Sequence, residues 1–297
     1  MTITVKVIAD SISPSGQRLS TMQLRYPRFI HAEFMTHRMF SRNASSSRAI
    51  PVERIIRDIQ EDPAVPVHWG ANQSGMQARE ELDSEAKLLA SCHWFDAMDD
   101  TIKQVQELVK LGLHKQVANR LLEPWSHINV VVTATDWANF FALRCHPDAQ
   151  PEIQQLAQTM QHALLLSTPR LLVPGEWHLP YVEVDDYQEA VRYLQQGRVT
   201  RDMPSQEEVA HVLRKVSTAR CARVSYLTHD GRKTTLVEDI ELHNKLVEAE
   251  PLHASPAEHQ ATPDEKFTNV WANAQLHGNF VGWCQHRKML PNEFVAG

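Results

Sequence analysis

The sequence lacks any apolar run that approaches the roughly 20 residues of a membrane-spanning helix. Its first residues, MTITVKVIADSISPSG, also lack the apolar core and small-residue cleavage site of a secretory signal peptide. These two absences argue against a membrane-spanning or secreted protein. We therefore expect a cytoplasmic protein.

Glycine and cysteine are scarce. The chain has 10 glycines and no G-x-G-x-x-G motif, so a Rossmann-type dinucleotide-binding fold has no support. No two cysteines form a C-x-x-C pair, which argues against a zinc ribbon and a thioredoxin-like redox motif. We expect reduced, mostly buried thiols with structural roles at Cys92, Cys145, Cys221 and Cys284.

Basic residues are not in excess. There are 30 Lys and Arg against 36 Asp and Glu, which gives a formal net charge of -6. Binding of a nucleic-acid polymer over a broad face is therefore disfavoured, and a local anion site is favoured.

The hydrophobic pattern predicts a mixed α+β fold. At 297 residues and 42% hydrophobic, the chain can bury a sizeable core. Alternating or branched residues predict strands, and spacings of three and four predict amphipathic helices. The expected strands are a half-buried one over 22–34 and a buried one over 128–135. The expected helices lie over 85–113, where Gly112 marks the end, over 137–144, where Thr135 or Asp136 is the cap, and over 185–197. A further helix is expected from Pro151, with Ile153, Leu156, Met160 and Leu164 on one face.

One short run concentrates positive charge and hydroxyl groups. Residues 35–51, MTHRMFSRNASSSRAIP, contain three arginines and four serines and no acidic residue. Arg48 offers a planar fork of donors that suits a phosphate, and the hydroxyls and N–H groups of residues 45–47 could surround one. Composition alone leaves two interpretations open, a phosphate-binding loop and a solvated, flexible loop.

The order of residues in this run resembles a family signature. The flavin-dependent thymidylate synthases (ThyX type) carry R-H-R-x-x-S-x-N-E-x-S-x-R-Y, and the chain has THRMFSRNASSSRA without gaps. The signature is matched at His37, Arg38, Ser41, Asn43, Ser46 and Arg48, and it is not matched at Thr36, Ala44 and Ala49.

A second block supports the resemblance. Residues 114–157 are similar to a family stretch that ends in Asn-Phe-x-x-Leu-Arg and Ala-Gln-x-Glu-Ile. The positions in register are Asn139, Phe140, Leu143, Arg144, Ala149, Gln150, Glu152 and Ile153. Arg120 is a candidate for an earlier family arginine, whereas Thr133 and Thr135 stand where an asparagine and an arginine usually stand.

A third block matches in an unexpected place. The family usually begins with Ala-x-Arg-Val-Ser-[Tyr/Phe] and His-x-[Ser/Thr]-Pro-x-Glu-His, yet here ARCARVSY (219–226) and HASPAEHQATP (253–263) lie near the C-terminal end. The chain resembles a circularly permuted member, a change that folds tolerate when the old termini lie close together. We therefore expect one ThyX-like domain over 1–297, in which 1–200 carries the first two blocks and 201–297 resembles the usual N-terminal segment. The rival interpretation is an added domain with its own function.

The resemblance implies a fold, a site and an activity. The fold would be an antiparallel sheet packed with long helices, in a homotetramer that binds FAD at the subunit junction in the cytoplasm of a bacterial cell or phage-infected host. Reductive methylation would convert dUMP to dTMP with methylenetetrahydrofolate and with reduced FAD that NADPH recharges, and Arg144 would stabilise anionic character on the pyrimidine. The implied flavin-binding residues are His37, Arg38, Asn43, Asn139, Ser225, His253 and Ser255. The implied nucleotide-binding residues are Glu33, Ser46, Ser47, Arg48, Arg120 and Arg144.

The departures from the family pattern leave alternatives open. Glu33 stands where an extended signature has glutamine, and a carboxylate cannot donate as an amide does unless it is protonated. An enzyme that acts on dCMP, or that leaves a hydroxymethyl group for modified DNA precursors, is therefore an alternative. A non-catalytic nucleotide-binding relative is another, because Thr36 and Ala44 replace a family arginine and glutamate.

The histidine-rich C-terminal block does not predict a metal site. His253 and His259 flank Glu258, but their spacing fits no standard zinc pattern, and hydrogen-bonded packing is the favoured interpretation. The pair His286 and Arg287 receives no role from the sequence.

Overall fold

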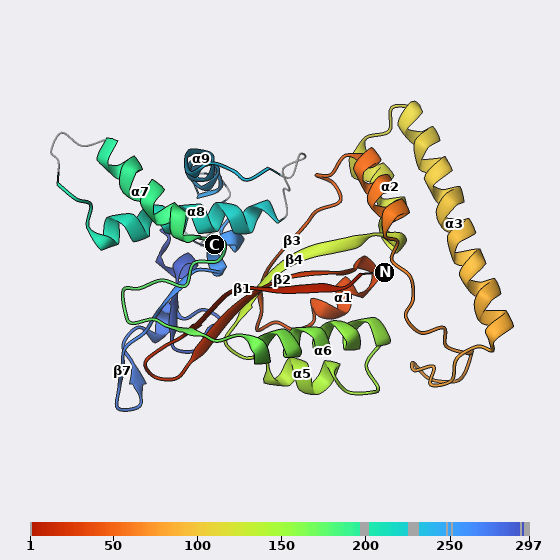
Figure 1. Ribbon diagram of the computed structural model, residues 1–297, viewed down its shortest axis with the longest axis horizontal. Coiled ribbons are helices and arrows are strands. Elements are labelled where there is room, and N and C mark those ends of the chain that lie inside the picture. Colours follow the sequence, from red (N-terminus) through yellow and green to blue (C-terminus); the bar gives the residue numbers. More distant parts are fainter. Residues whose placement is uncertain are drawn as a thin grey trace.

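The structure is a computed structural model that describes residues 2–196, 202–224, 232–247, 249–250, 252–291 and 293. A five-stranded sheet of order β3-β4-β2-β1-β5 lies at its centre, with helical groups around it (Figure 1). The strands of this sheet are β1 (Thr4–Ile12), β2 (Arg18–Pro27), β3 (Ser41–Ala44), β4 (His127–Ala134) and β5 (Arg170–Leu171). The helices are α1 (His31–Phe34), α2 (Val52–Glu61), α3 (Ser84–Lys110), α4 (Lys115–Ala118), α5 (Ala138–Arg144), α6 (Pro151–Leu166), α7 (Val184–Gln196), α8 (Gln206–Arg223) and α9 (Leu236–Val247). The mixed α+β class is confirmed.

Short elements complete the chain. Two small antiparallel sheets pair β6 (Ala261–Pro263) with β9 (Trp283–Gln285) and β7 (Lys266–Phe267) with β8 (Val270–Trp271). Short 3-10 helices are η1 (Arg28–Ile30), η2 (Asn119–Trp125), η3 (Ser255–Glu258), η4 (Ala274–Leu276) and η5 (His286–Met289).

The central sheet has one apolar face and one polar face. Its long strands pair antiparallel, and only the short edge strand β5 pairs parallel, with β1. Because side chains alternate along a strand, residues paired across strands share a face. Met22 pairs with Val132 on the face that packs against α5 and α6, whereas Thr21 pairs with Thr133 on the opposite face. Asn43 pairs with Val131 and lies on this second face.

Helices α5 and α6 cover the apolar face, below the sheet in Figure 1. The predicted helix from Pro151 is confirmed as α6, and Ile153, Leu156, Met160 and Leu164 are all buried. The helix predicted over 137–144 corresponds to α5, but its N-cap is Trp137, which makes no side-chain cap bond, so neither Thr135 nor Asp136 occupies the cap position. Asp136 lies one residue earlier, where its Oδ1 accepts a hydrogen bond from the Ala138 N–H (3.0 Å).

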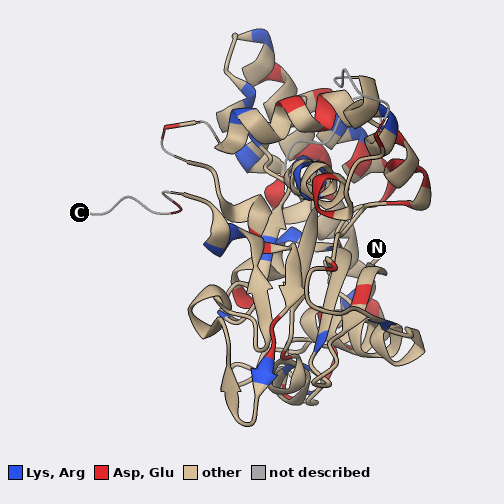
Figure 2. Cartoon of the chain, turned by 90° about the vertical axis from the view of Figure 1, so that its left-hand side faces the viewer, with Lys and Arg blue, Asp and Glu red and all other residues tan. Residues whose placement is uncertain are grey.

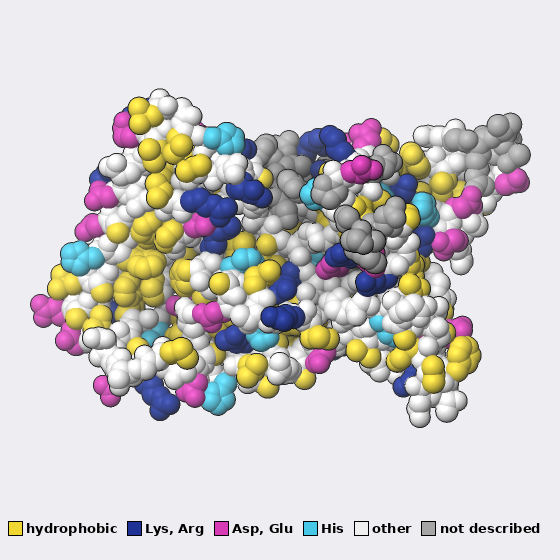
Figure 3. Space-filling model, turned by 180° about the vertical axis from the view of Figure 1, so that it is seen from behind, with side chains coloured by type: hydrophobic (Ala, Val, Ile, Leu, Met, Phe, Trp, Pro, Cys, Tyr) yellow, Lys and Arg dark blue, Asp and Glu magenta, His cyan; other side chains and the backbone are white. Residues whose placement is uncertain are grey.

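A second helical group lies at one end of the sheet. The predicted long helix is confirmed as α3, which starts at the cap Asp83 and ends just before Gly112 at φ +85°. Its three buried residues, Met98, Ile102 and Val105, all lie in its second half, where they pack against α2 and η2. Leu88 and Leu89 in the first half are 65% and 55% exposed, and hydrophobic side chains gather on this end of the molecule (Figure 3).

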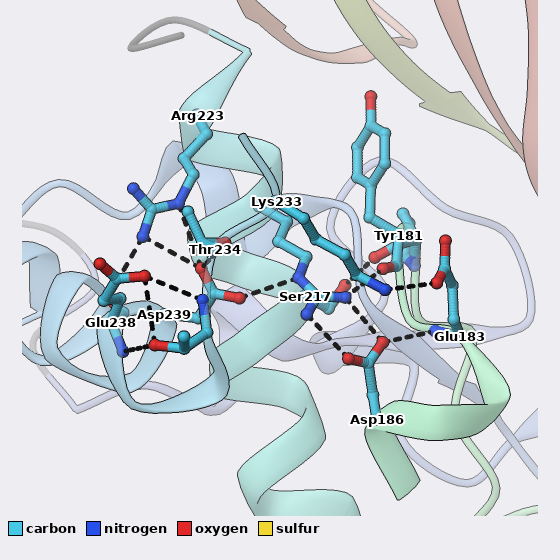
Figure 4. A network of polar contacts seen from close by, with 12 residues as sticks. Tyr181, Glu183, Asp186, Ser217, Arg223, Lys233, Thr234, Glu238 and Asp239 are labelled. Atoms are coloured by element: carbon cyan, nitrogen blue, oxygen red, sulfur yellow. Dashed lines mark hydrogen bonds and ion pairs between the residues drawn. The ribbon is translucent and has the colours of Figure 1, made fainter. Parts of the chain in front are cut away.

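The third helical group consists of α7 together with α8 and α9 from the C-terminal block. Helix α8 begins with a capping box of Ser205 and Glu208 and packs against α7, α9 and η3. Arg220 and Arg223 of α8 pair with Asp186 of α7 and Asp239 of α9, which ties the three helices together (Figure 4). Acidic and basic side chains are interspersed over this group (Figure 2).

Element η3 packs against β3, at the edge of the central sheet. The block 201–297 therefore reaches the strand that carries Asn43 of the first block, although more than 200 residues separate Asn43 from Ser255.

Two expectations need correction. The strand expected over 22–34 ends at Pro27, and η1 and α1 follow, because Ile30 and Phe34 are buried from a helical turn and proline cannot continue a central strand. All four cysteines are free, but only Cys221 and Cys284 are buried, while Cys92 is exposed and Cys145 is partly exposed. In the described part of the chain, no helix is both long and apolar enough to span a membrane.

Candidate functional site

A cavity of about 460 Å³ lies where the serine- and arginine-rich run meets the C-terminal block. Asn43 at the end of β3, Ser46 and Arg48 line it from the first block. His253 and Ser255 line it from the last block. The Nδ2 of Asn43 donates a hydrogen bond to the Ser255 hydroxyl (3.2 Å). These five positions come together in one place, whereas Ser225 lies outside the described residues.

The lining of this cavity favours an anionic or acceptor-rich ligand. Among the described residues that line it, Arg48 is the only Lys or Arg and none is Asp or Glu. Arg48 is exposed, so its guanidinium can turn into the cavity, and hydroxyls of Ser46 and Ser255 add donors. The backbone also turns tightly here, since the Ala49 N–H donates to the Ser46 carbonyl (3.0 Å).

Ser47 and Arg120 lie outside this cavity lining and contact Glu123 of η2. The Ser47 hydroxyl, which is buried, donates to Glu123 Oε1 (2.8 Å), and Arg120 Nη1 donates to the same oxygen (2.9 Å). The Ser47 carbonyl accepts a hydrogen bond from the Asn119 Nδ2 (2.7 Å). Ser47 therefore anchors the loop to η2.

Arg144, the last residue of α5, forms a second cluster. Its Nε donates to Nε2 of His37 (3.0 Å), and its Nη1 lies 3.6 Å from a Glu33 carboxylate oxygen. Burial first, and then the charge of Arg144, lowers the pKa of His37, so this imidazole is a neutral acceptor. The His37 ring also packs edge-on against Phe140 at 4.8 Å between centroids. His37 and Glu33 thus hold the guanidinium in place, and Phe140 supports the His37 ring.

This second cluster borders a larger hollow of about 1410 Å³, which Glu33 and Arg144 line together with Trp94. Asn139, in the first turn of the same helix, is exposed, as is Arg38 in the segment before β3. Within one chain, the structure therefore brings together two groups of the predicted residues, one around Asn43 and Arg48 and one around His37 and Arg144. The predicted residues Arg38, Ser47, Arg120 and Asn139 line neither hollow.

The sequence did not indicate the polar groups behind Asn43. The Oδ1 of Asn43 lies 3.0 Å from Nε2 of His259, whose Nδ1 lies 2.8 Å from the hydroxyl of Thr133. His259 is fully buried, which confirms hydrogen-bonded packing for this histidine. The neighbouring Glu258 forms an ion pair with Arg287, which gives the second His-Arg pair of the sequence a structural partner. The sequence feature that could have indicated these polar groups is the alternation of polar and apolar residues along β2 and β4.

One group of potential metal ligands occurs among the described residues, namely Asp264, His277 and Cys284. Asp264 already accepts hydrogen bonds from the backbone and side chain of Asn273 and from His277 Nε2 (2.8–2.9 Å). Burial raises the pKa of the Cys284 thiol to about 12, so the thiol of the metal-free group is protonated at neutral pH. We interpret this group as a hydrogen-bonded support for the C-terminal block.

Buried neutral histidines predict that acid destabilises the fold. Burial is the largest cause that lowers the pKa of six described histidines to about 3 or about 4, namely His31, His127, His178, His243, His259 and His286. In the unfolded chain their pKa is about 6.5, so below that pH the unfolded state binds protons that the folded state excludes. The stability present above pH ~6.5 is therefore lost as the pH falls toward 3–4, by up to ~1.4 kcal/mol per pH unit for each fully buried imidazole. Urea unfolding at pH about 7 and about 5 measures this, and equal free energies of unfolding at the two values would contradict it.

The chain matches one known protein family over more than half of its length. The model of the family described as "Thymidylate synthase complementing protein" (Thy1) matches residues 13–170, more than half of the chain. This match includes the first two blocks and both residue groups, apart from His253 and Ser255. A comparison with curated protein sequences gives no significant match.

Two solved structures match about half of the chain. They are crystal structures of a UMP/dUMP methylase PolB from Streptomyces cacaoi, one bound with 5-Br UMP and the other with 5-Br dUMP. Each is 18% identical to the chain and covers 55% of it, with TM-scores of 0.45 and 0.43. The alignments cover 88% and 90% of those two chains.

Proposed function

Since this chain belongs to the thymidylate synthase complementing protein family, we propose that it is a flavin-dependent enzyme that methylates a pyrimidine deoxynucleotide monophosphate. The first candidate reaction is the reductive methylation of dUMP to dTMP, with methylenetetrahydrofolate as the one-carbon donor and NADPH as the reductant. One observation carries the proposal: Asn43 and Arg48 of the first block share a cavity with His253 and Ser255 of the last block.

The cavity lining fits a flavin. Asn43, His253 and Ser255 would hold FAD, because they offer an amide, an imidazole and a hydroxyl to its carbonyl oxygens and ring nitrogens. A bound flavin supplies hydride chemistry that the side chains of the protein cannot supply. We propose that the block 201–297 completes this site, as the N-terminal segment does in the common form of the family.

The arginines would bind and polarise the nucleotide. Ser46 and Arg48 would bind the 5′-phosphate, where bidentate charge-assisted hydrogen bonds are strongest. Arg144 would lie against the pyrimidine and stabilise negative charge that develops on it, and His37 keeps the guanidinium in one orientation. Positioning of the two reactants supplies much of the remaining rate acceleration.

Methylation of dCMP is a second candidate reaction, which the position of Glu33 favours. Its carboxylate lies beside Arg144 in the larger hollow. An ionised carboxylate accepts but does not donate hydrogen bonds, and cytosine presents an amino donor where uracil presents an oxygen acceptor. We expect Glu33→Gln, which adds an amide donor, to shift the preference of the enzyme from dCMP toward dUMP.

We also propose that the protein functions as a homo-oligomer, a homotetramer by analogy with its family. The group around Arg144 and the group around Arg48 form separate hollows in one chain, so a second copy can bring them together. The exposed first half of α3 offers an apolar surface for such contact.

The double variant Leu88→Glu/Leu89→Glu is expected to dissociate this oligomer into smaller species, because four oxygens of two carboxylates would be buried without partners. Sedimentation velocity measures the change. Val184→Glu, at a 78% exposed position of α7, is the matched control and should leave the assembly unchanged. An identical mass for the double variant and the control would show that α3 is not the interface.

Flavin binding tests the proposed function. We expect the purified protein to be yellow, or to quench the fluorescence of added FAD at micromolar concentrations. If neither FAD nor FMN binds while dUMP or dCMP does, the chain is a nucleotide-binding relative without flavin chemistry.

A further inference from the structure

A line of buried polar side chains runs across the molecule and ends at Asn43. It crosses β1, β2 and β4 and includes two histidines from distant segments. Its members are joined by the contacts Ser11 Oγ to His178 Nδ1 (2.8 Å), His178 Nε2 to Thr21 Oγ1 (2.8 Å), Thr21 Oγ1 to Thr133 Oγ1 (2.7 Å), Thr133 Oγ1 to His259 Nδ1 (2.8 Å) and His259 Nε2 to Asn43 Oδ1 (3.0 Å). The five residues behind Asn43 are 0–5% exposed.

The direction of every hydrogen bond in this line follows from its last member. The Oδ1 of Asn43 can only accept, so His259 carries its proton on Nε2 and its Nδ1 must accept from the Thr133 hydroxyl. Because Thr133 donates its single proton to His259, it accepts from Thr21. By the same reasoning, Thr21 accepts from Nε2–H of His178, whose Nδ1 accepts from Ser11.

The two imidazoles are neutral in this arrangement. Burial lowers the pKa of both His178 and His259 to about 3, so each ring has one donor and one acceptor nitrogen at neutral pH. A neutral imidazole between two fixed partners transmits the orientation of one partner to the other. Reversal of Asn43 would require both tautomers and the hydroxyls of Thr133, Thr21 and Ser11 to reverse together, and any partial reversal would leave a buried polar atom unpaired.

We propose that His259 is a positioning residue, and that the line from Ser11 to His259 fixes Asn43 with its amide N–H groups toward the cavity. One Nδ2 proton is donated to Ser255, and the other is free for a ligand. The site therefore presents a donor at this point and selects a ligand with a carbonyl oxygen or an unprotonated ring nitrogen there. That this ligand is FAD rests on the proposed function, whereas the orientation of Asn43 does not.

Threonine-to-valine substitutions test the line. Thr133→Val keeps the shape of the side chain but removes both the donor for His259 and the acceptor for Thr21. The matched control is Thr218→Val, since Thr218 is 1% exposed and its hydroxyl contacts Gln260, outside the line. Thr133→Ser restores the hydroxyl and should rescue the variant.

Two measurements are made on these proteins. In the ¹⁵N NMR spectrum of the free wild-type protein, we expect the Nε2–H tautomer for both His178 and His259, and a single ordered amide for Asn43 that changes in Thr133→Val. By fluorescence titration, we expect Thr133→Val to bind FAD about tenfold more weakly than Thr218→Val and Thr133→Ser, a difference of ~1.4 kcal/mol.

The Nδ1–H tautomer in either histidine, or an Asn43 amide that responds equally to Thr133→Val and Thr218→Val, would overturn the proposal. If the wild-type protein binds no FAD, the proposed cofactor fails, and the ligand-free NMR spectra alone decide the role of His259.

Discussion

Replacement of Arg48 by alanine is expected to weaken binding of pyrimidine monophosphates by at least ~100-fold while the fold stays intact. Two charge-assisted hydrogen bonds to a phosphate are worth ~3 kcal/mol together, and each ~1.4 kcal/mol is a factor of ten in affinity. The side chain is exposed in the free protein, so its truncation should change the free energy of unfolding by less than ~0.5 kcal/mol. Isothermal titration with dUMP and with dCMP measures the loss.

The matched control for this change is Arg192→Ala. Arg192 lies on α7, away from both hollows, and its Nη2 contacts only the Gln188 side chain among the contacts described. Equal affinity of Arg48→Ala and the control for every pyrimidine monophosphate would show that Arg48 does not bind the phosphate.

The change Asp239→Ala is expected to lower the free energy of unfolding by ~3–5 kcal/mol. Asp239 is fully buried and accepts hydrogen bonds from Arg220 Nε (2.8 Å), Arg223 Nε (3.1 Å) and the Thr234 hydroxyl (2.7 Å) (Figure 4). Without this carboxylate, Arg220 keeps only Asp186 as an ionic partner, and Arg223 loses its buried partner. Urea unfolding followed by circular dichroism measures the effect.

An exposed ion pair provides the comparison. Asp100 pairs with Lys103 at 2.9 Å, and these side chains are 74% and 69% exposed, so Asp100→Ala should cost less than ~1 kcal/mol. If both variants unfold at the same urea concentration, the buried network does not stabilise the fold. A large loss confined to Asp239→Ala would also affect the ligand site, because α8 carries Ala222 in the cavity lining.

Much of the fold could be predicted from local patterns. The helix α3, the buried strand β4 and the start of α6 at Pro151 each follow from one clear periodicity or one terminal residue. The end of β2 could not be predicted in the same way. Residues 28–34 have the composition of a strand, and only tertiary packing of Ile30 and Phe34 makes the helical turns favourable.

The residues of the candidate site could be predicted where they belong to a sequence motif. The order of residues in the first block and the displaced third block indicated that Asn43, Arg48, His253 and Ser255 belong together, and these four line one cavity. The roles of these residues stay a prediction.

The groups behind the cavity were not predictable, because no motif spans them. His178 and His259 belong to segments 81 residues apart, and only the three-dimensional pairing of β2 with β4 places Thr21 and Thr133 between them. Ser47 shows that a position next to site residues in sequence does not ensure a place in the site. It lies between Ser46 and Arg48, yet its side chain points away from the cavity, and its hydroxyl donates to Glu123.

If the chain methylates a pyrimidine nucleotide with a flavin, the mass of the nucleotide product shows it directly. The purified protein is incubated with FAD, methylenetetrahydrofolate and NADPH, together with either dUMP or dCMP. We predict a product heavier than its substrate by one methyl group in place of hydrogen, formed only when flavin, folate and reductant are all present. A nucleotide of unchanged mass from both substrates, recovered from a folded and flavin-loaded protein, would show that the chain is not a pyrimidine nucleotide methylase.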